Sequence, residues 1–175
     1  MVFTPIQQQL DSIKKSPVRE AKAVAEQVLS NPFILVEVVD CIRSDDPALR
    51  SRAARVVEIV GVKNPDIVQP YKKEILDELA WIDHWVVRAH LSKIVPLLNL
   101  NPKEVSRAFD LFEHYLSDSS SVVRTFAMQG MFDLLDRAPE RITDVRILIE
   151  SLMDGGTPAM RSRGRMLLVA IEELE

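Results

Sequence analysis

Apolar residues recur at a helical spacing in four segments of the chain, each beginning one residue before an arginine. In the first segment, around Arg50, the apolar positions are Leu49, Ala53, Val56, Val57 and Val60. The segments at Arg88, Arg124 and Arg161 place apolar or small residues at the same offsets. Because this spacing keeps the side chains on one face of an α-helix, the sequence predicts four amphipathic helices.

Prolines mark the start of a second set of helices. They follow asparagine or alanine at intervals of 33, 37 and 37 residues, in Asn31-Pro32, Asn64-Pro65, Asn101-Pro102 and Ala138-Pro139. Asparagine is a favoured N-cap, and proline suits the first helical position because its missing N–H would have no partner there. Glu104, three residues after Asn101, completes the pattern of a capping box. Each proline is therefore predicted to open a helix.

The repeat arginines are 38, 36 and 37 residues apart, so both patterns have nearly the same period. They predict helical hairpins of about 37 residues, which must stack on one another to bury their apolar faces. The predicted fold is all-α, a right-handed α-α superhelix (solenoid) forming a single domain over 1–175. Its parts are a leading helix pair at 5–30 and repeats at about 31–63, 64–100, 101–138 and 139–175.

Each predicted hairpin turn contains an aspartate, which is followed by an apolar residue and an arginine and then by a small residue. These aspartates are Asp46, Asp83, Asp118 and Asp154. This pattern resembles HEAT repeats over residues 16–175, and more loosely the HEAT-like repeats of phycobilin lyases. The resemblance implies a scaffold that binds a partner on the concave surface lined by the second helices. It also implies an Asp–Arg ladder between repeats, although the Asp-to-Arg separation varies from 4 to 7 residues.

We interpret the repeat arginines as structural residues; they are Arg19, Arg50, Arg88, Arg124 and Arg161. Each lies at a predicted helix start beside a polar turn. From there a guanidinium group is expected to bridge turn carboxylates and carbonyls of the next repeat.

Candidate partner-binding residues lie on the solvent side of the second helices, two and five positions after the repeat arginines. They are Arg52, Arg55, His90, Lys93, Phe126, Gln129, Arg163 and Met166. In a chain of net charge −4, they predict a basic stripe that attracts a protein or peptide partner of acidic character. Phe126, Met166 and Trp85 would supply apolar anchors. The alternative interpretation is a solvated helix face whose charges are neutralised by nearby carboxylates.

The acidic balance disfavours nucleic acid as the partner. DNA-alkylation repair glycosylases nevertheless also use HEAT-like repeats, and Trp81, Asp83, His84 and Trp85 cluster in one turn. Nucleic-acid binding or repair therefore stays an alternative function, as does a phycobilin-lyase-like role. We interpret the tryptophans as packing or partner contacts.

We expect no enzyme activity, no catalytic or metal site and no cofactor. The three histidines (His84, His90 and His114) lack metal-ligand spacing. Cys41 is interpreted as a small buried hydrophobic residue, because no base accompanies it in the sequence. Gly155-Gly156 is too short to cradle a phosphate and is interpreted as a turn.

The last predicted helix, 166–175, spreads its apolar residues widely around its circumference, so the C-terminal face is predicted to be incompletely capped. We therefore expect a monomer or a weak dimer. No stretch reaches the roughly 18–20 apolar residues that a bilayer span needs, and residues 1–15 lack the apolar run of a signal peptide. Together with a single cysteine, these features predict a cytoplasmic chain without a membrane partner.

Overall fold

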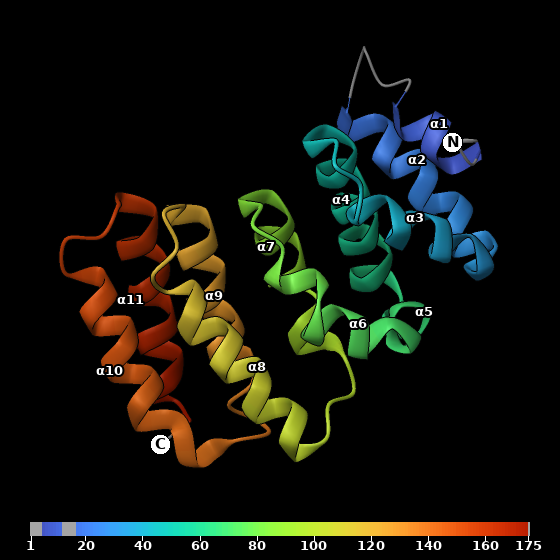
Figure 1. The fold of residues 1–175 in the computed structure, drawn as a ribbon. Coiled ribbons are helices and arrows are strands. Elements are labelled where there is room, and N and C mark those ends of the chain that lie inside the picture. Colours follow the sequence, from blue (N-terminus) through green and yellow to red (C-terminus); the bar gives the residue numbers. More distant parts are fainter. Residues whose placement is uncertain (1–4, 12–16, 175) are drawn as a thin grey trace. The chain divides into compact units, whose positions relative to one another are not determined.

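The computed structural model describes residues 5–11 and 17–174, without the side chains of residues 17–20. Helices are the regular secondary structure of this part of the chain, and none of its residues lies in a strand (Figure 1). The predicted all-α class is therefore confirmed. The chain divides into two compact units, Met1–Asn99 and Leu100–Glu175. The division falls beside the predicted boundary between the second and third repeats, and a single domain stays a prediction.

The first unit is centred on α4 (Pro47–Lys63), which packs against α2 (Pro17–Ser30), α3 (Leu35–Ile42) and α7 (Trp85–Leu91). The helix α1 (Pro5–Asp11) packs against α2, α3 and α4. The remaining elements are short: η1 (Pro32–Ile34), α5 (Pro65–Val68), η2 (Gln69–Tyr71), α6 (Lys72–Asp77), η3 (Leu79–Trp81) and η4 (Val95–Leu97).

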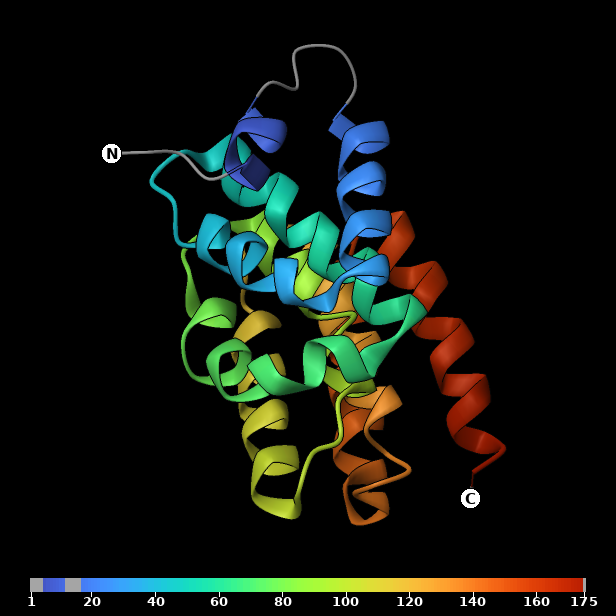
Figure 2. The ribbon, with the colours of Figure 1, turned by 90° about the vertical axis from the view of Figure 1, so that its right-hand side faces the viewer.

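The second unit contains two long hairpins. In the first, α8 (Pro102–Tyr115) packs against α9 (Ser121–Asp133); in the second, α10 (Ile142–Met153), preceded by η5 (Pro139–Arg141), packs against α11 (Pro158–Glu172). The helix α9 also packs against α10 and α11. Figure 2 shows α11, in red, along its full length. The second helices α9 and α11 are thus neighbours within this unit. The first unit has the same order, because α4 lies next to both α2 and α7.

The core consists of the apolar face that the sequence predicts. The positions counted from Arg50, Arg88, Arg124 and Arg161 are buried, apart from the half-buried Leu168. A fully buried Val, Leu or Ile side chain stabilises the fold by about 1.5–3 kcal/mol relative to an exposed one. The helical face is therefore confirmed as the main source of core burial in both units.

Pro65 and Pro102 begin α-helices as predicted, whereas Pro32 and Pro139 begin 3₁₀ turns that lead into α3 and α10, and the caps differ. Asn101 accepts hydrogen bonds from the amides of Lys103 and Glu104, both at 3.0 Å, and the Glu104 carboxylate accepts from the Asn101 amide at 2.7 Å. This is the predicted capping box. The side chains of Asn31 and Asn64 accept no such bond, and the first of them precedes a 3₁₀ turn.

Pro96 ends the second helix of the second repeat. The α-helix stops at Leu91, and the amides of Lys93 and Ile94 then donate three residues back, to His90 at 3.2 Å and to Leu91 at 2.9 Å. A proline has no N–H for the carbonyl four residues earlier and its ring clashes with the preceding turn. The chain accordingly continues as 3₁₀ turns after Leu91.

Candidate functional site

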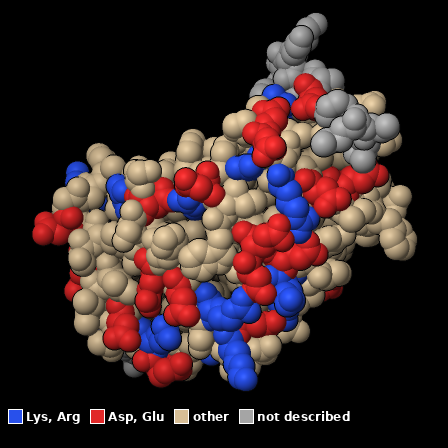
Figure 3. Space-filling view, viewed as in Figure 1, with Lys and Arg blue, Asp and Glu red and all other residues tan. Residues whose placement is uncertain are grey.

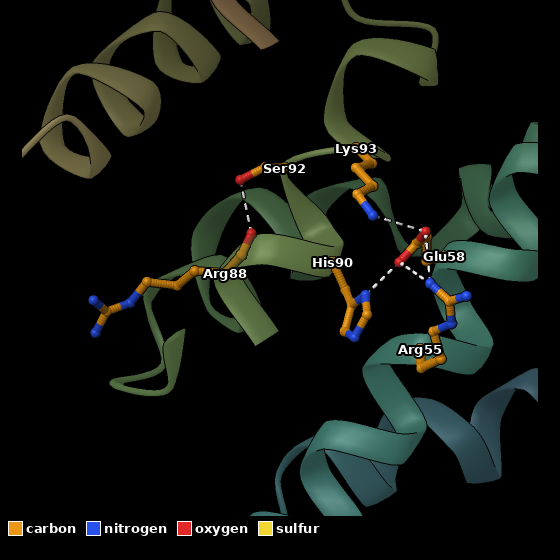
Figure 4. A network of polar contacts seen from close by, with 6 residues as sticks. All are labelled: Arg55, Glu58, Arg88, His90, Ser92 and Lys93. Atoms are coloured by element: carbon orange, nitrogen blue, oxygen red, sulfur yellow. Dashed lines mark hydrogen bonds and ion pairs between the residues drawn. The ribbon is translucent and has the colours of Figure 1, made fainter. Parts of the chain in front are cut away.

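A cluster of charged side chains joins α4 to α7 around Glu58 (Figure 4). Arg55, one turn before Glu58 on the same helix, donates to both of its carboxylate oxygens at 3.1 Å. From α7 and the turn that follows it, His90 Nδ1 contacts Oε2, and Lys93 Nζ donates to Oε1 at 3.1 Å. Arg88 points away from this cluster in Figure 4. Three predicted stripe residues therefore share one carboxylate.

Glu58 is buried, with 8% of the residue exposed. Burial alone would raise the pKa of this carboxyl, but hydrogen bonds from His90 and Lys93 and their positive charges outweigh it and lower the pKa to about 2. A buried ionised carboxylate needs such partners, because an unpaired one is costly. The cluster thus pairs basic groups that the sequence analysis assigned to an open stripe with a buried carboxylate, and their role in partner binding stays a prediction.

Glu58 was missed in the sequence because it lies 32 residues from His90 along the chain. Two local signals pointed to it. It follows the core residues Val56 and Val57 directly, and it stands three residues after Arg55 on the same helix, a spacing at which opposite charges meet.

Other stripe residues also contact neighbouring helices. Arg52 donates to the carbonyl of Leu10 in α1 at 2.6 Å. In the second unit Arg163 donates to Gln129 Oε1 at 2.9 Å, and Gln129 donates to Asp133 Oδ1 at 2.7 Å. Arg52, His90 and Arg163 all stand two positions after a repeat arginine, so in each case this position links a second helix to an earlier helix of its unit.

The predicted apolar anchors differ in exposure. Trp85 is 50% exposed at the start of α7, and Met166 is 62% exposed on α11. Phe126 on α9 is half-buried. Trp85 belongs to the first unit and the other two to the second.

The repeat arginines hold the hairpin turns, each through a backbone carbonyl five or six residues earlier. Arg50 donates to Ser44 at 2.7 and 3.0 Å and Arg88 to Ile82 at 3.1 Å, while Arg124 and Arg161 donate to Asp118 and Gly156. These acceptors lie in the arginine's own hairpin, and the predicted bridge to the next repeat stays a prediction. The Arg19 side chain lies outside the described residues.

The described contacts of three turn aspartates lie within their own hairpins, and the Asp–Arg ladder stays a prediction. Asp83 pairs with Arg88 of its own hairpin, whereas Asp46 accepts from the Ala48 amide at 2.8 Å as an N-cap. Asp118 accepts from the amide of Ser120 at 2.7 Å. Short local hydrogen bonds of this kind are available as soon as the turn forms, without a partner from another repeat.

The described contacts of the tryptophan-rich turn lie within its own hairpin. Asp83 pairs with Arg88, and Trp81 Nε1 donates to the Leu76 carbonyl at 2.9 Å. Burial, and after it the charges of Arg50 and Arg88, lower the pKa of His84. Its Nδ1 is buried without a hydrogen-bond partner in the structure. The described contacts of these side chains are therefore structural.

Cys41 is buried, and burial followed by the carboxylates of Asp11, Asp40 and Glu37 raises its pKa to about 11. A thiol in such surroundings stays protonated and unreactive near neutral pH. Within residues 5–11 and 17–174, no three His, Cys, Asp or Glu side chains gather as a metal ion would require.

An apolar groove opens on the first unit between the starts of two successive helix pairs. It has a volume of about 510 Å³ and is lined by Pro32, Phe33, Val36, Asp66, Ile67, Pro70 and Tyr71. Phe33 is 88% exposed and Val36 48%. A phenylalanine in that state leaves nearly all of its apolar surface in water, which is unfavourable by about 25 cal/mol per Å². The sequence analysis missed Phe33, because an aromatic residue in a first helical turn usually belongs to the core.

The groove has a carboxylate side. Asp66, exposed at the start of α5, makes no ion pair with the described residues. Burial, and then the charges of Glu74 and Asp40, raise the pKa of Tyr71. Arg43 forms ion pairs with both Asp40 and Glu74, so its positive charge partly offsets their negative charges.

Elsewhere acidic and basic side chains are interspersed, as the face in Figure 3 shows. Comparison of the chain with protein-family models, curated proteins and solved structures finds no match. No helix among the described residues is both long and apolar enough to cross a bilayer. Functional inference for this chain therefore rests on the geometry given above.

Proposed function

We propose that this chain is a non-catalytic interaction module that binds a protein or peptide partner. The exposed groove around Phe33 is the observation that carries the proposal. Soluble proteins seldom leave large apolar side chains together in a concave surface unless another molecule covers them. Glu58 and Cys41, two groups with displaced pKa values, occupy structural positions instead.

The partner we infer is a peptide segment with a large apolar side chain next to a lysine or arginine. The apolar group would fill the space between Phe33 and Tyr71, and the basic group would reach Asp66, the carboxylate on the groove wall. Apolar anchors supply most of the affinity in such sites, whereas charges at the rim select the partner. The groove thus favours a basic partner, while the stripe predicted from the sequence favoured an acidic one. Since Arg55 and Lys93 of the stripe already pair with Glu58, the groove has the stronger support.

We also propose that the hairpins continue as a right-handed α-α superhelix of HEAT type. Support comes from the order of second helices within each unit, where α4 neighbours both α2 and α7, and α9 neighbours α11. Nuclear Overhauser contacts between α7 and α9 in solution would be expected of a continuous superhelix. Their absence would contradict this part of the proposal without affecting the groove.

The groove is tested with peptide arrays. One set of twelve-residue peptides combines an aromatic or leucine residue with lysine or arginine, and a second set carries glutamate in place of the basic residue. The array compares the two sets, and fluorescence anisotropy then measures binding of the best peptide. We expect the basic set to bind, Phe33→Ser to weaken binding at least tenfold, and Asp66→Lys to reverse the charge preference. Ile147→Ser, which alters an exposed apolar residue of α10, is the matched control and should bind like the unmodified chain. Equal binding by Phe33→Ser, or no peptide bound at 100 µM protein (about −5.5 kcal/mol or weaker), would contradict the proposal.

A further inference from the structure

The outer face of α11 continues a pattern that α4 and α9 use to receive the next second helix. On α4 the residues five and eight positions after the repeat arginine are Arg55 and Glu58, and this face contacts α7. On α9 the residues five and nine positions after it are Gln129 and Asp133, and this face contacts α11. These positions therefore mark the receiving face of a second helix.

The same positions on α11 are apolar and open. They hold Met166, Val169 and Ala170, and a shallow groove runs along them between Arg165 and Glu173. Met166 is 62% and Val169 57% exposed. Polar groups occupy the receiving faces that are filled within this chain, whereas α11 presents methyl and thioether groups with a charge at either end.

The order of residues along this face is self-complementary. Arg165 lies four residues before Val169 and Glu173 four residues after it, so each charge is about 6 Å along the helix axis from the central valine. All three side chains lie on one face of the helix, together with Met166 and Ala170. When two such helices run antiparallel about a two-fold axis at Val169, each Arg165 faces a Glu173 and the apolar groups meet at the centre. A parallel pair would instead place Arg165 against Arg165.

We propose that this chain forms a homodimer through antiparallel pairing of α11 with α11 of a second copy. A two-fold interface must be complementary to itself, and this face meets that condition in both charge and apolar content. Neither Arg165 nor Glu173 has an ion-pair partner among the described residues, so both are available. The small Ala170 permits close approach of the two helix axes, which in packed helices lie about 8–10 Å apart.

One helix pair covers less surface than a standard stable interface, so we expect a weak dimer with a dissociation constant on the order of tens of micromolar. Sedimentation equilibrium of the unmodified chain between 5 µM and 1 mM measures this constant. Val169→Glu should keep the chain monomeric across that range, since it would place two carboxylates opposite each other at the centre of the pair. The exposed position of Val169 leaves the core intact, and circular dichroism melting checks this.

Charge reversal distinguishes this antiparallel dimer from dimers that do not pair Arg165 with Glu173. Arg165→Glu or Glu173→Arg alone places like charges together and should weaken association at least tenfold. The double variant Arg165→Glu/Glu173→Arg restores opposite charges and should return the dissociation constant to within threefold of the original. Glu150→Arg on α10 is the control for a change of net charge and should leave association unaltered. A monomer at 1 mM, an unaffected Val169→Glu variant, or a double variant as weak as the single ones would each overturn the proposal.

Discussion

Replacing Glu58 by glutamine keeps the shape of the side chain but removes the negative charge that Arg55, His90 and Lys93 share. In the folded chain the pKa of this carboxyl is about 2, against an ordinary value of 4.5. With about 1.36 kcal/mol for each pKa unit, the ionised carboxylate stabilises the fold by about 3 kcal/mol at neutral pH. Glu58→Gln should lose about this amount, because three basic groups then lack their common acceptor.

The loss should depend on pH in a defined direction. A carboxyl whose pKa is lower in the folded state binds fewer protons folded than unfolded, so its stabilisation is fully present above about pH 4.5. It declines as the pH falls through that value toward 2, where both states become protonated. The free energies of unfolding of Glu58→Gln and the unmodified chain should therefore differ by about 3 kcal/mol at pH 7 and converge near pH 2. Hydrogen bonds also lower the pKa of Glu26 and Glu78, but these groups titrate equally in both proteins and cancel in the difference.

Urea unfolding followed by tryptophan fluorescence measures this difference in the first unit, since both tryptophans, Trp81 and Trp85, belong to it. For a slope of about 1–3 kcal/mol per molar urea, the midpoint should fall by roughly 1–3 M at pH 7. Asp45→Asn, which changes an exposed turn residue of the same unit, should shift stability by less than about 0.5 kcal/mol. Equal midpoints for Glu58→Gln and the unmodified chain at pH 7, or a difference that does not shrink on acidification, would refute the reasoning.

Three further outcomes follow from local geometry. A Cβ at Gly130 would overlap the Phe112 ring, so Gly130→Ala should destabilise the second unit by about 1–3 kcal/mol, measured by circular dichroism melting. Asn101→Ala should cost about 1 kcal/mol through loss of the capping box, whereas Asn31→Ala should cost much less because Asn31 accepts no cap hydrogen bond; urea titration of both variants compares them. Cys41, buried and with a pKa raised to about 11, should react with a thiol reagent at least a hundredfold more slowly in the folded chain than in urea, and equal rates would contradict its burial.

Helix starts could be predicted from the sequence because their signals are local. Pro102 with Asn101 and Glu104 contains the whole capping box within four residues, and the structure contains that box. The buried face after Arg50 could be predicted for a similar reason, because a 3.6-residue period is visible within a single helix. These elements do not depend on which helices become neighbours.

The polar contacts between helices could not be predicted in the same way. In the sequence, Glu58 is simply one acidic residue within a predicted helix. It becomes buried because α7, which carries His90 32 residues later in the chain, packs against α4. Likewise, the repeat arginines were correctly placed beside turns, but the choice between their own turn and the next depends on distances that spacing does not encode. The exposure of Phe33 is a similar case, because only the arrangement of η1 and α5 leaves it uncovered.

The link formed two positions after a repeat arginine also explains why second helices in one unit stack in a fixed alignment. An apolar face built from Val, Ala and Leu permits several nearly equivalent offsets along the helix axis, because dispersion contacts are not directional. The contact of His90 with Glu58, or the hydrogen bond from Arg163 to Gln129, is lost when the offset changes by one turn, and the unsatisfied group then costs about 1–3 kcal/mol. The receiving face of α11 lacks such an acceptor at its centre and has its charges only at the ends. A helix that pairs there is aligned by Arg165 and Glu173 alone, which is why charge reversal, rather than truncation of an apolar side chain, gives the sharper test of what binds to it.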